Sequence, residues 1–368
     1  MMLLRRLLLG VTAVVATAAC SRSHTAHEYV IGAVAPQKLS YGIMNQRGID
    51  LAIEEINREG GIHGQPLRVV IRNDNASGVE AARIASQFVA DDKIAAVVGH
   101  AGSGAMVSAA PIYHAGKLVA VATTPSSPDL TGVSPWVFRM ITSDSVNGIT
   151  LAHFATSFAN ALGHPVRAAI LYSNDAYGRG LAESFQRNFQ GEVISADPVG
   201  SAADMEPFVT YYKLRKPDLV FVASDPEVGI PFLHEVRRQA FNAIFLGGDG
   251  WQGVVRDSAA EGVYIGAPFS AQQNDGAAQR FVNAFRARYG QTPDAHAALA
   301  YDATQLVAKA IMTVGDDRGK IRDYLSGLTE STAFHGVTGV THFLPTNDPA
   351  TDGFIITQVS HGMLIPVQ

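Results

Sequence analysis

The chain has 368 residues, of which 47% are apolar and only 17% are charged, so it can bury a large core and disorder is excluded. Without the leader described next, which contains two of the 28 basic residues, 26 basic residues face 33 acidic ones, a formal charge of about −7. No block of Lys or Arg occurs, so nucleic acid is excluded as a partner.

Residues 1–19 have the features of a signal peptide, with Arg5 and Arg6 ahead of an apolar run that ends in small residues. The run from Leu7 to Ala19 is short of the roughly 20 residues that a membrane-spanning helix needs. We therefore expect export of the remaining chain rather than a membrane span.

Cys20 is the chain's one cysteine, and its position directly after this run resembles a lipobox. The resemblance implies a lipid on Cys20, a tether over residues 20–27 and anchoring at the extracytoplasmic, periplasmic face of a membrane. Ordinary secretion with cleavage after Ala18 is the alternative, because Thr17 departs from the aliphatic residue usual there.

From Tyr29 onward, strand-like apolar runs alternate with helical patterns. Within residues 48–61, Ile49, Ile53 and Ile56 fall on one helical face, and two glycines end the helix. The series continues with strands at 67–73, 94–100 and 117–123 and helices at 80–92 and from Gly104. This alternation predicts a parallel sheet that is covered by helices on both faces.

A second series of the same kind begins near residue 149 and continues to residue 268, which predicts a second α/β unit. Two further helices and two strand-like segments complete the chain. No low-complexity linker separates the units, so we expect two lobes joined by short crossing segments.

The stretch "VGHAGSGAM", residues 98–106, joins a buried strand to a helix. Ligands of open α/β sheets bind beyond the carboxyl ends of strands, where free N–H groups at a helix N-terminus favour anions. Ser103 is expected to cap the helix that begins at Gly104 and to bind a carboxylate; a plain cap with no ligand is the alternative.

Segments along most of the chain resemble the periplasmic leucine/isoleucine/valine-binding protein family. They are "GIDLAIEEINREGGIHGQPLRVVIRNDN", "VVGHAGSGA", "FRMITSDSVNG", "YSNDAYGRGLAESF", "PDLVFVAS", "AEGVYIGAPF" and "ALAYDATQLVAKAI". The resemblance implies a type I periplasmic binding protein fold of class α/β, with two lobes, three hinge crossings and a mostly parallel sheet in each lobe. Lobe 1 is expected over 28–142 and 271–334, and lobe 2 over 143–270 and 335–368.

The same resemblance assigns ligand-binding residues. Ser103 and Ser126 correspond to residues that hold the ligand carboxylate, and Thr124 to one that contributes its backbone carbonyl. Asp249 corresponds to an acidic residue that pairs with the ligand ammonium, while Tyr177 and Tyr41 line the cleft from the second and first lobe.

Local sequence leaves alternatives open for two of these residues and for the nearby Trp251. Asp249 lies in "GGDG", which also suits a structural turn, and Tyr177 precedes a glycine and suits an ordinary strand-end aromatic. Trp251 is either a cleft wall or core.

Two departures from the family pattern concern specificity. "APQKLSYG" replaces a smaller turn after the first strand, and Ser224 or Asp225 stands where some members place an aromatic residue against the ligand. Leucine specificity is therefore not carried over, and we expect a wider or more polar side-chain pocket.

The function expected from these features is delivery of an amino acid, branched-chain or related, to the permease of an ABC importer by hinge closure. Sensing of an amide, urea or small carboxylic acid is the alternative. No G-x-S-x-G, P-loop or H-E-x-x-H motif occurs, so we expect no enzymatic activity, metal or cofactor. A monomer is expected.

Overall fold

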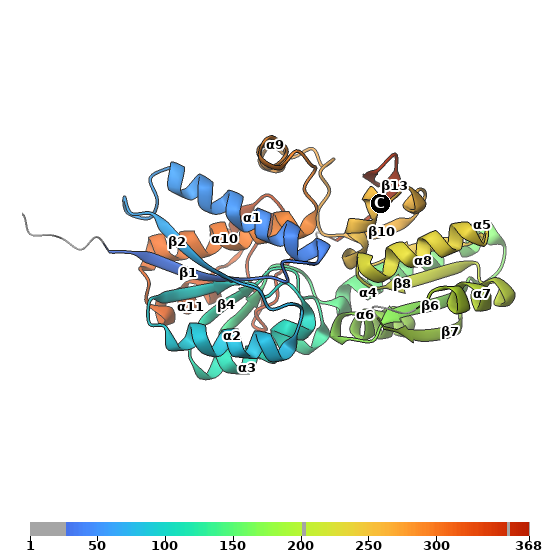
Figure 1. The fold of residues 1–368 in the computed structure, drawn as a ribbon, viewed down its shortest axis with the longest axis horizontal. Coiled ribbons are helices and arrows are strands. Elements are labelled where there is room, and N and C mark those ends of the chain that lie inside the picture. Colours follow the sequence, from blue (N-terminus) through green and yellow to red (C-terminus); the bar gives the residue numbers. More distant parts are fainter. Residues whose placement is uncertain (1–26, 201–203, 352–353, 368) are drawn as a thin grey trace, which may run out of the picture.

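The computed structural model describes residues 27–200, 204–351 and 354–367, arranged as two α/β lobes side by side (Figure 1). The predicted leader, Cys20 and most of the tether lie outside these ranges. None of the helices in the described ranges combines the length and the apolar character needed to cross a membrane.

The first lobe is built on a parallel sheet in the order β2-β1-β3-β4-β5. Its strands are β1 (Tyr29–Val34), β2 (Leu67–Arg72), β3 (Ile94–Val98), β4 (Val119–Ala122) and β5 (Val137–Arg139). Its helices are α1 (Ser40–Arg58), α2 (Gly78–Ala90), α3 (Ser103–Ala115), the 3-10 helix η1 (Pro128–Leu130), α9 (Gly276–Tyr289), α10 (Ala295–Val314), α11 (Arg318–Ser326) and the 3-10 helix η4 (Glu330–Thr332).

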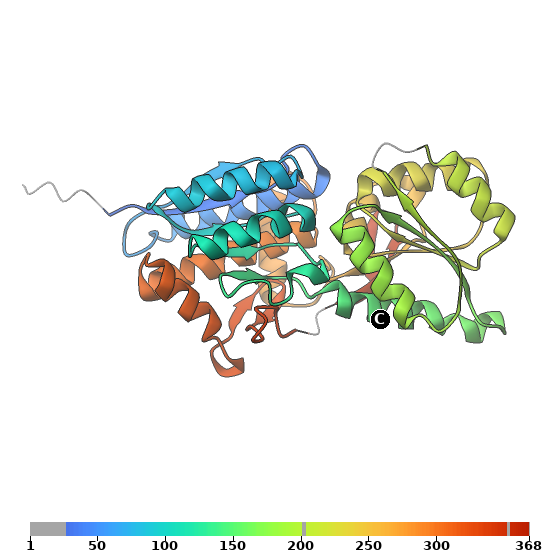
Figure 2. The same cartoon turned by 90° about the horizontal axis from the view of Figure 1, so that it is seen from below.

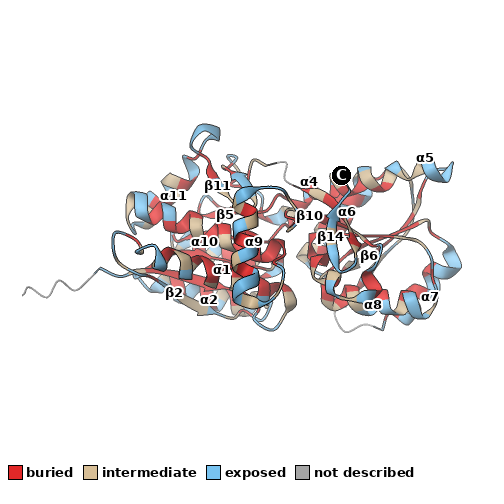
Figure 3. Ribbon diagram, turned by 90° about the horizontal axis from the view of Figure 1, so that it is seen from above, coloured by how far each residue is buried: buried red, intermediate tan, exposed pale blue. Residues whose placement is uncertain are grey.

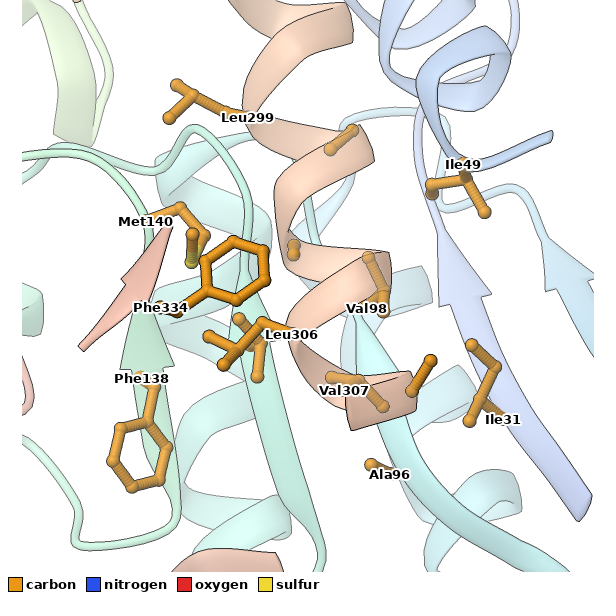
Figure 4. Packing of buried hydrophobic residues seen from close by; sticks show 14 of the residues in the cluster. Ile31, Ile49, Ala96, Val98, Phe138, Met140, Leu299, Leu306, Val307 and Phe334 are labelled. Atoms are coloured by element: carbon orange, nitrogen blue, oxygen red, sulfur yellow. The ribbon is translucent and has the colours of Figure 1, made fainter. Parts of the chain in front are cut away.

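Alternating strand residues place apolar side chains on both faces of this sheet. Ile31 of β1 packs in the cluster that includes α1 and α10, whereas its neighbour Val30 packs in the cluster with α2 and α3. Figure 4 shows Leu306 and Val307 of α10 beside the strands. Figure 3 shows buried residues concentrated on the strands and on the inward sides of the helices, as a parallel sheet covered on both faces requires.

The second lobe has a mixed sheet in the order β14-β13-β10-β9-β8-β6-β7, in which β13 and β14 are antiparallel. Its strands are β6 (Arg167–Ser173), β7 (Glu192–Val199), β8 (Leu219–Ala223), β9 (Ile244–Gly247), β10 (Tyr264–Ala267), β13 (Ile355–Ser360) and β14 (Met363–Pro366). Its helices are α4 (Asp144–Ser157), α5 (Ala159–Leu162), α6 (Ala176–Asn188), α7 (Glu206–Arg215), α8 (Pro226–Arg238) and the 3-10 helices η2 (Asp249–Arg256) and η3 (Ser258–Ala260).

The predicted class, α/β with a largely parallel sheet in each lobe, is confirmed, while one helix start differs from expectation and one open question is answered. Helix α1 begins at Ser40, well before the expected start at Gly48. Trp251 is fully buried in the second lobe's core, where its indole nitrogen donates to the Ser224 hydroxyl at 2.8 Å. Of the two places left open for it, Trp251 therefore occupies the core.

The chain passes between the lobes near residues 142 and 269 and again before Phe354 (Figure 2). Residues 335–350 are predicted to belong to the second lobe. In the structure, the hairpin of β11 (Phe334–Gly336) and β12 (Gly339–Thr341) binds Asp302 of α10 through two backbone N–H groups, and Phe343 packs on Phe138. We therefore propose that the first lobe includes residues 28–142 and 271–350.

Candidate ligand-binding cleft

A cleft of about 750 Å³ lies where the two lobes meet. Its lining comes from the segments at the ends of β1, β2, β3 and β4 in the first lobe and of β6, β7, β8 and β9 in the second, with His296 added from α10. These are the carboxyl ends of parallel strands, where helices begin and strand side chains give way to exposed backbone. The fold therefore directs loops from both lobes to one shared space.

Helix α3 presents its N-terminus to the cleft, with Gly102, Ser103 and Gly104 all in the lining. Gly102 occupies the cap position and Ser103 is the first helical residue, so the prediction that Ser103 caps the helix is wrong. The Ser103 hydroxyl instead accepts from the N–H of Ser127 at 3.2 Å. The first-turn N–H groups lack a side-chain cap, which leaves a partial positive charge at this wall.

Two further predicted residues from the first lobe reach the cleft. Thr124 lies in the lining, and its hydroxyl donates to the carbonyl of Ala101 at 2.8 Å, which ties the loop after β4 to the loop before α3. Tyr41, near the start of α1, is 7% exposed and lies 5.8 Å from the His296 ring, centroid to centroid. Burial, with the nearby carboxylates, raises the pKa of Tyr41 well above its usual range, so its hydroxyl remains neutral.

Asp249 and Tyr177 form a connected pair in the second lobe. The Tyr177 hydroxyl donates to Asp249 Oδ1 at 3.2 Å and accepts from the N–H of Gly250 at 2.9 Å. Asp249 is only 4% exposed, and burial raises the pKa of its carboxyl, although the positive charge of His296 opposes this rise. The pair therefore presents a buried carboxylate that gains from a cationic partner.

Ser126 does not line the cleft, unlike the other predicted contacts. It is fully buried and donates to Asp144 Oδ2 at 3.0 Å, while the Asp144 N–H donates to the Ser126 carbonyl at 2.8 Å. Burial and the charge of Asp249 raise the pKa of Asp144 well above its ordinary value. Ser126 thus connects the first lobe to the start of α4 at a crossing between the lobes.

Sequence reasoning did not place Asp175, Glu227 or His296 in the cleft, and it noted Asp225 only as a departure from the family pattern. The lining includes Asp175 after β6, Asp225 and Glu227 around the start of α8, and His296 from α10. Asp225 and Glu227 flank Pro226 in the segment already noted as a departure from the family pattern, which is the one signal available. No sequence motif around His296 distinguishes it from other histidines in helices.

The lobes also touch directly at the edges of the cleft. Glu227 Oε1 accepts from the backbone N–H of Ser40 at 3.0 Å and from its hydroxyl at 3.1 Å. On another side, Gln252 accepts from the N–H of Ala295 at 2.9 Å. These hydrogen bonds join side chains of the second lobe to helix N-termini of the first. A change in the relative position of the lobes would therefore change both these bonds and the width of the cleft.

The fold and the cleft define a class: a two-lobed protein with its binding space at the lobe interface. A family model described as "Periplasmic binding protein" matches residues 30–362. The chain belongs to this family, which confirms the resemblance seen in the sequence.

Relatives and solved structures of this class carry different ligands. The chain is 29% identical over 326 residues to an "Amino acid binding protein" of Pseudomonas aeruginosa, covering 82% of this chain and 83% of that protein. A branched-chain amino acid transporter substrate binding protein from Streptococcus pneumoniae, solved with isoleucine, superposes with a TM-score of 0.83 at 26% identity, covering 92% of this chain and 99% of that one. A Rhodopseudomonas palustris solute binding protein with 3,4-dihydroxybenzoic acid gives 0.83 at 22% identity, covering 92% and 96%, and shows the fold alone.

Proposed function

We propose that the protein binds an α-amino acid between its lobes and presents it to the permease of an ABC importer. The observation that carries this proposal is the lining itself: a helix N-terminus with Ser103 belongs to one lobe, and the buried carboxyl of Asp249 belongs to the other. An α-amino acid has a carboxylate for the first and an ammonium for the second. Each charged end of the ligand therefore gains a partner in the protein when it loses its contacts with water.

A ligand held in this way favours closure of the lobes. It contacts both lobes at once, so it binds the closed arrangement better than the open one. Moving the population from 1:99 to 99:1 takes roughly 5.5 kcal/mol of differential binding. The hydrogen bonds from Ser40 to Glu227 already join the two lobes beside the cleft.

The acidic second wall supports an amino acid over a carboxylic acid. A ligand such as an aromatic acid has no cationic group, and it would leave the carboxyl of Asp249 buried without a counter-charge. Sensing by the same binding step is the alternative role. We propose import rather than sensing, because the chain belongs to the periplasmic binding protein family. The proposal includes lipid anchoring through Cys20 at the periplasmic face, a monomeric state and no catalysis.

A thermal-shift screen tests the proposed function. The chain from Ser21 onward is unfolded and refolded to remove bound ligand, then heated with amino acids, amides, urea and small carboxylic acids. A ligand at 100 times its dissociation constant stabilises by about 2.7 kcal/mol. We expect stabilisation by at least one α-amino acid; stabilisation by carboxylic acids alone would refute the proposal.

The substitution Ser103→Ala is expected to weaken binding of that amino acid by about tenfold, because one hydroxyl contact to a carboxylate is lost while the backbone donors remain. Isothermal titration calorimetry measures the change. Ser108→Ala is the matched control, since Ser108 is on the same helix, is absent from the cleft lining and bonds to the Gly104 carbonyl of its own helix. Equal affinities for wild type and Ser103→Ala would remove Ser103 from the binding contacts.

A further inference from the structure

The cleft has more acidic groups than a neutral amino acid can use. Its lining contains the carboxyl groups of Asp175, Asp225, Glu227 and Asp249, and no Lys or Arg contributes to the lining in the part of the chain that the structure describes. One ammonium group satisfies one carboxylate. The remaining acidic groups therefore need either a structural role or a second partner.

Asp175 has a structural role. It caps α6, where its Oδ1 accepts from the N–H of Gly178 at 2.9 Å. This bond uses the orphan donors of a helix N-terminus in the usual way.

Asp225 and Glu227 are not explained in this way. Asp225 occupies the cap position of α8, yet its carboxylate makes no side-chain cap hydrogen bond there. Glu227 uses Oε1 for Ser40, but its Oε2 is buried and has no hydrogen-bond partner within the described ranges. Two carboxyl groups, two residues apart, thus retain acceptor capacity beside the cleft.

His296 does not supply the missing positive charge in full. It lines the cleft, is only 5% exposed, and its Nδ1 makes no hydrogen bond among the described residues, lying 3.7 Å from Asp294 Oδ1. Burial disfavours the imidazolium, but Asp294, Asp249 and Asp225 outweigh it and raise the pKa of His296. Its single charge interacts with Asp294 as well as with Asp249 and Asp225, so it does not satisfy each acidic group of the cleft.

We propose that the ligand is an α-amino acid whose side chain ends in a cationic group, an ammonium or a guanidinium, bound by Asp225 and Glu227. This inference rests on the proposed function, because Ser103 and Asp249 hold the amino acid's backbone groups. The cationic end provides the hydrogen-bond donors that the two carboxyl groups lack, and its charge favours their ionised form. Apolar amino acids supply neither.

Matched ligand pairs test the proposal by isothermal titration calorimetry with the purified protein. L-arginine is compared with L-citrulline, its neutral isostere, and L-lysine with L-norleucine, which has a chain of the same carbon count and no terminal ammonium. We expect the cationic member of at least one pair to bind at least about tenfold tighter than its neutral partner. A neutral partner that binds equally well or better in both pairs overturns the inference and leaves the proposed function standing.

Variants then connect the preference to the two acidic residues. Asp225→Asn is expected to reduce the ratio of cationic to neutral affinity by about tenfold, and Glu227→Gln serves as a second variant should the first fail to fold. Glu206→Gln, which removes an exposed first-turn carboxylate of the neighbouring helix α7, is the control and retains the wild-type ratio. An unchanged ratio in both cleft variants overturns the assignment of the cation to these residues. If no α-amino acid binds at all, the proposed function itself fails.

Discussion

Replacing Asp249 by alanine is expected to weaken binding of an α-amino acid at least about a hundredfold, roughly 3 kcal/mol. Asp249 is 4% exposed, and its carboxyl accepts from the Tyr177 hydroxyl, which in turn accepts from the N–H of Gly250. Without it, the ligand ammonium is buried without the carboxylate that is proposed to contact it directly. Calorimetric titration of wild type and variant measures the loss.

The control for this variant is Asp249→Asn, which keeps the shape and one acceptor but not the charge, so its affinity should lie between the other two. Unfolding temperature without ligand verifies that both variants fold. Removing a buried carboxyl whose pKa is raised does not destabilise the free protein through charge, so loss of binding is separable from loss of fold. Unaltered affinity in Asp249→Ala would exclude Asp249 from the ammonium site.

The second large effect concerns stability and pH. Burial, followed by the charges of Glu227 and Asp175, raises the pKa of Asp225 from 3.8 to about 8 in the folded protein. Because the folded state prefers the neutral carboxyl, the stability associated with Asp225 is lost as pH rises from about 4 through 8. Asparagine cannot ionise, so Asp225→Asn escapes this loss.

We therefore expect Asp225→Asn to be more stable than wild type without ligand, by about 2–4 kcal/mol at pH 8–9, since water in the cleft screens part of the effect. The difference should be close to zero near pH 4. Denaturant unfolding across this pH range measures it, with Glu206→Gln as the exposed control. A stability difference that does not vary with pH, or that favours wild type at high pH, would contradict the burial argument.

The sequence was sufficient to predict the alternation of strands and helices, because parallel strands buried on both faces read as continuous apolar runs such as Ile94–Val98. It was less informative about the late segments. Residues 335–350 pack on the first lobe because the β11–β12 hairpin meets Asp302 and Phe343 meets Phe138, contacts between residues far apart in the chain.

Site residues were predictable where a sequence motif marks the start of a helix. They were not predictable where a buried partner determines which way a side chain points. Ser103, Thr124, Asp249, Tyr177 and Tyr41 all line the cleft. Ser126 was expected there too, but its hydroxyl turns to Asp144, whose burial no local pattern reveals. The acidic surplus was not recognised because Asp175, Asp225 and Glu227 lie in separate segments of the second series that come together with Asp249 only in the folded protein.

The central claim is that the cleft holds both charged ends of an α-amino acid. Calorimetry with three forms of the tightest-binding amino acid tests it most directly: the parent, the amine that lacks the carboxylate, and the acid that lacks the ammonium. The account predicts that each analogue binds at least about tenfold more weakly than the parent. An acid that binds as tightly as its parent amino acid would contradict the account.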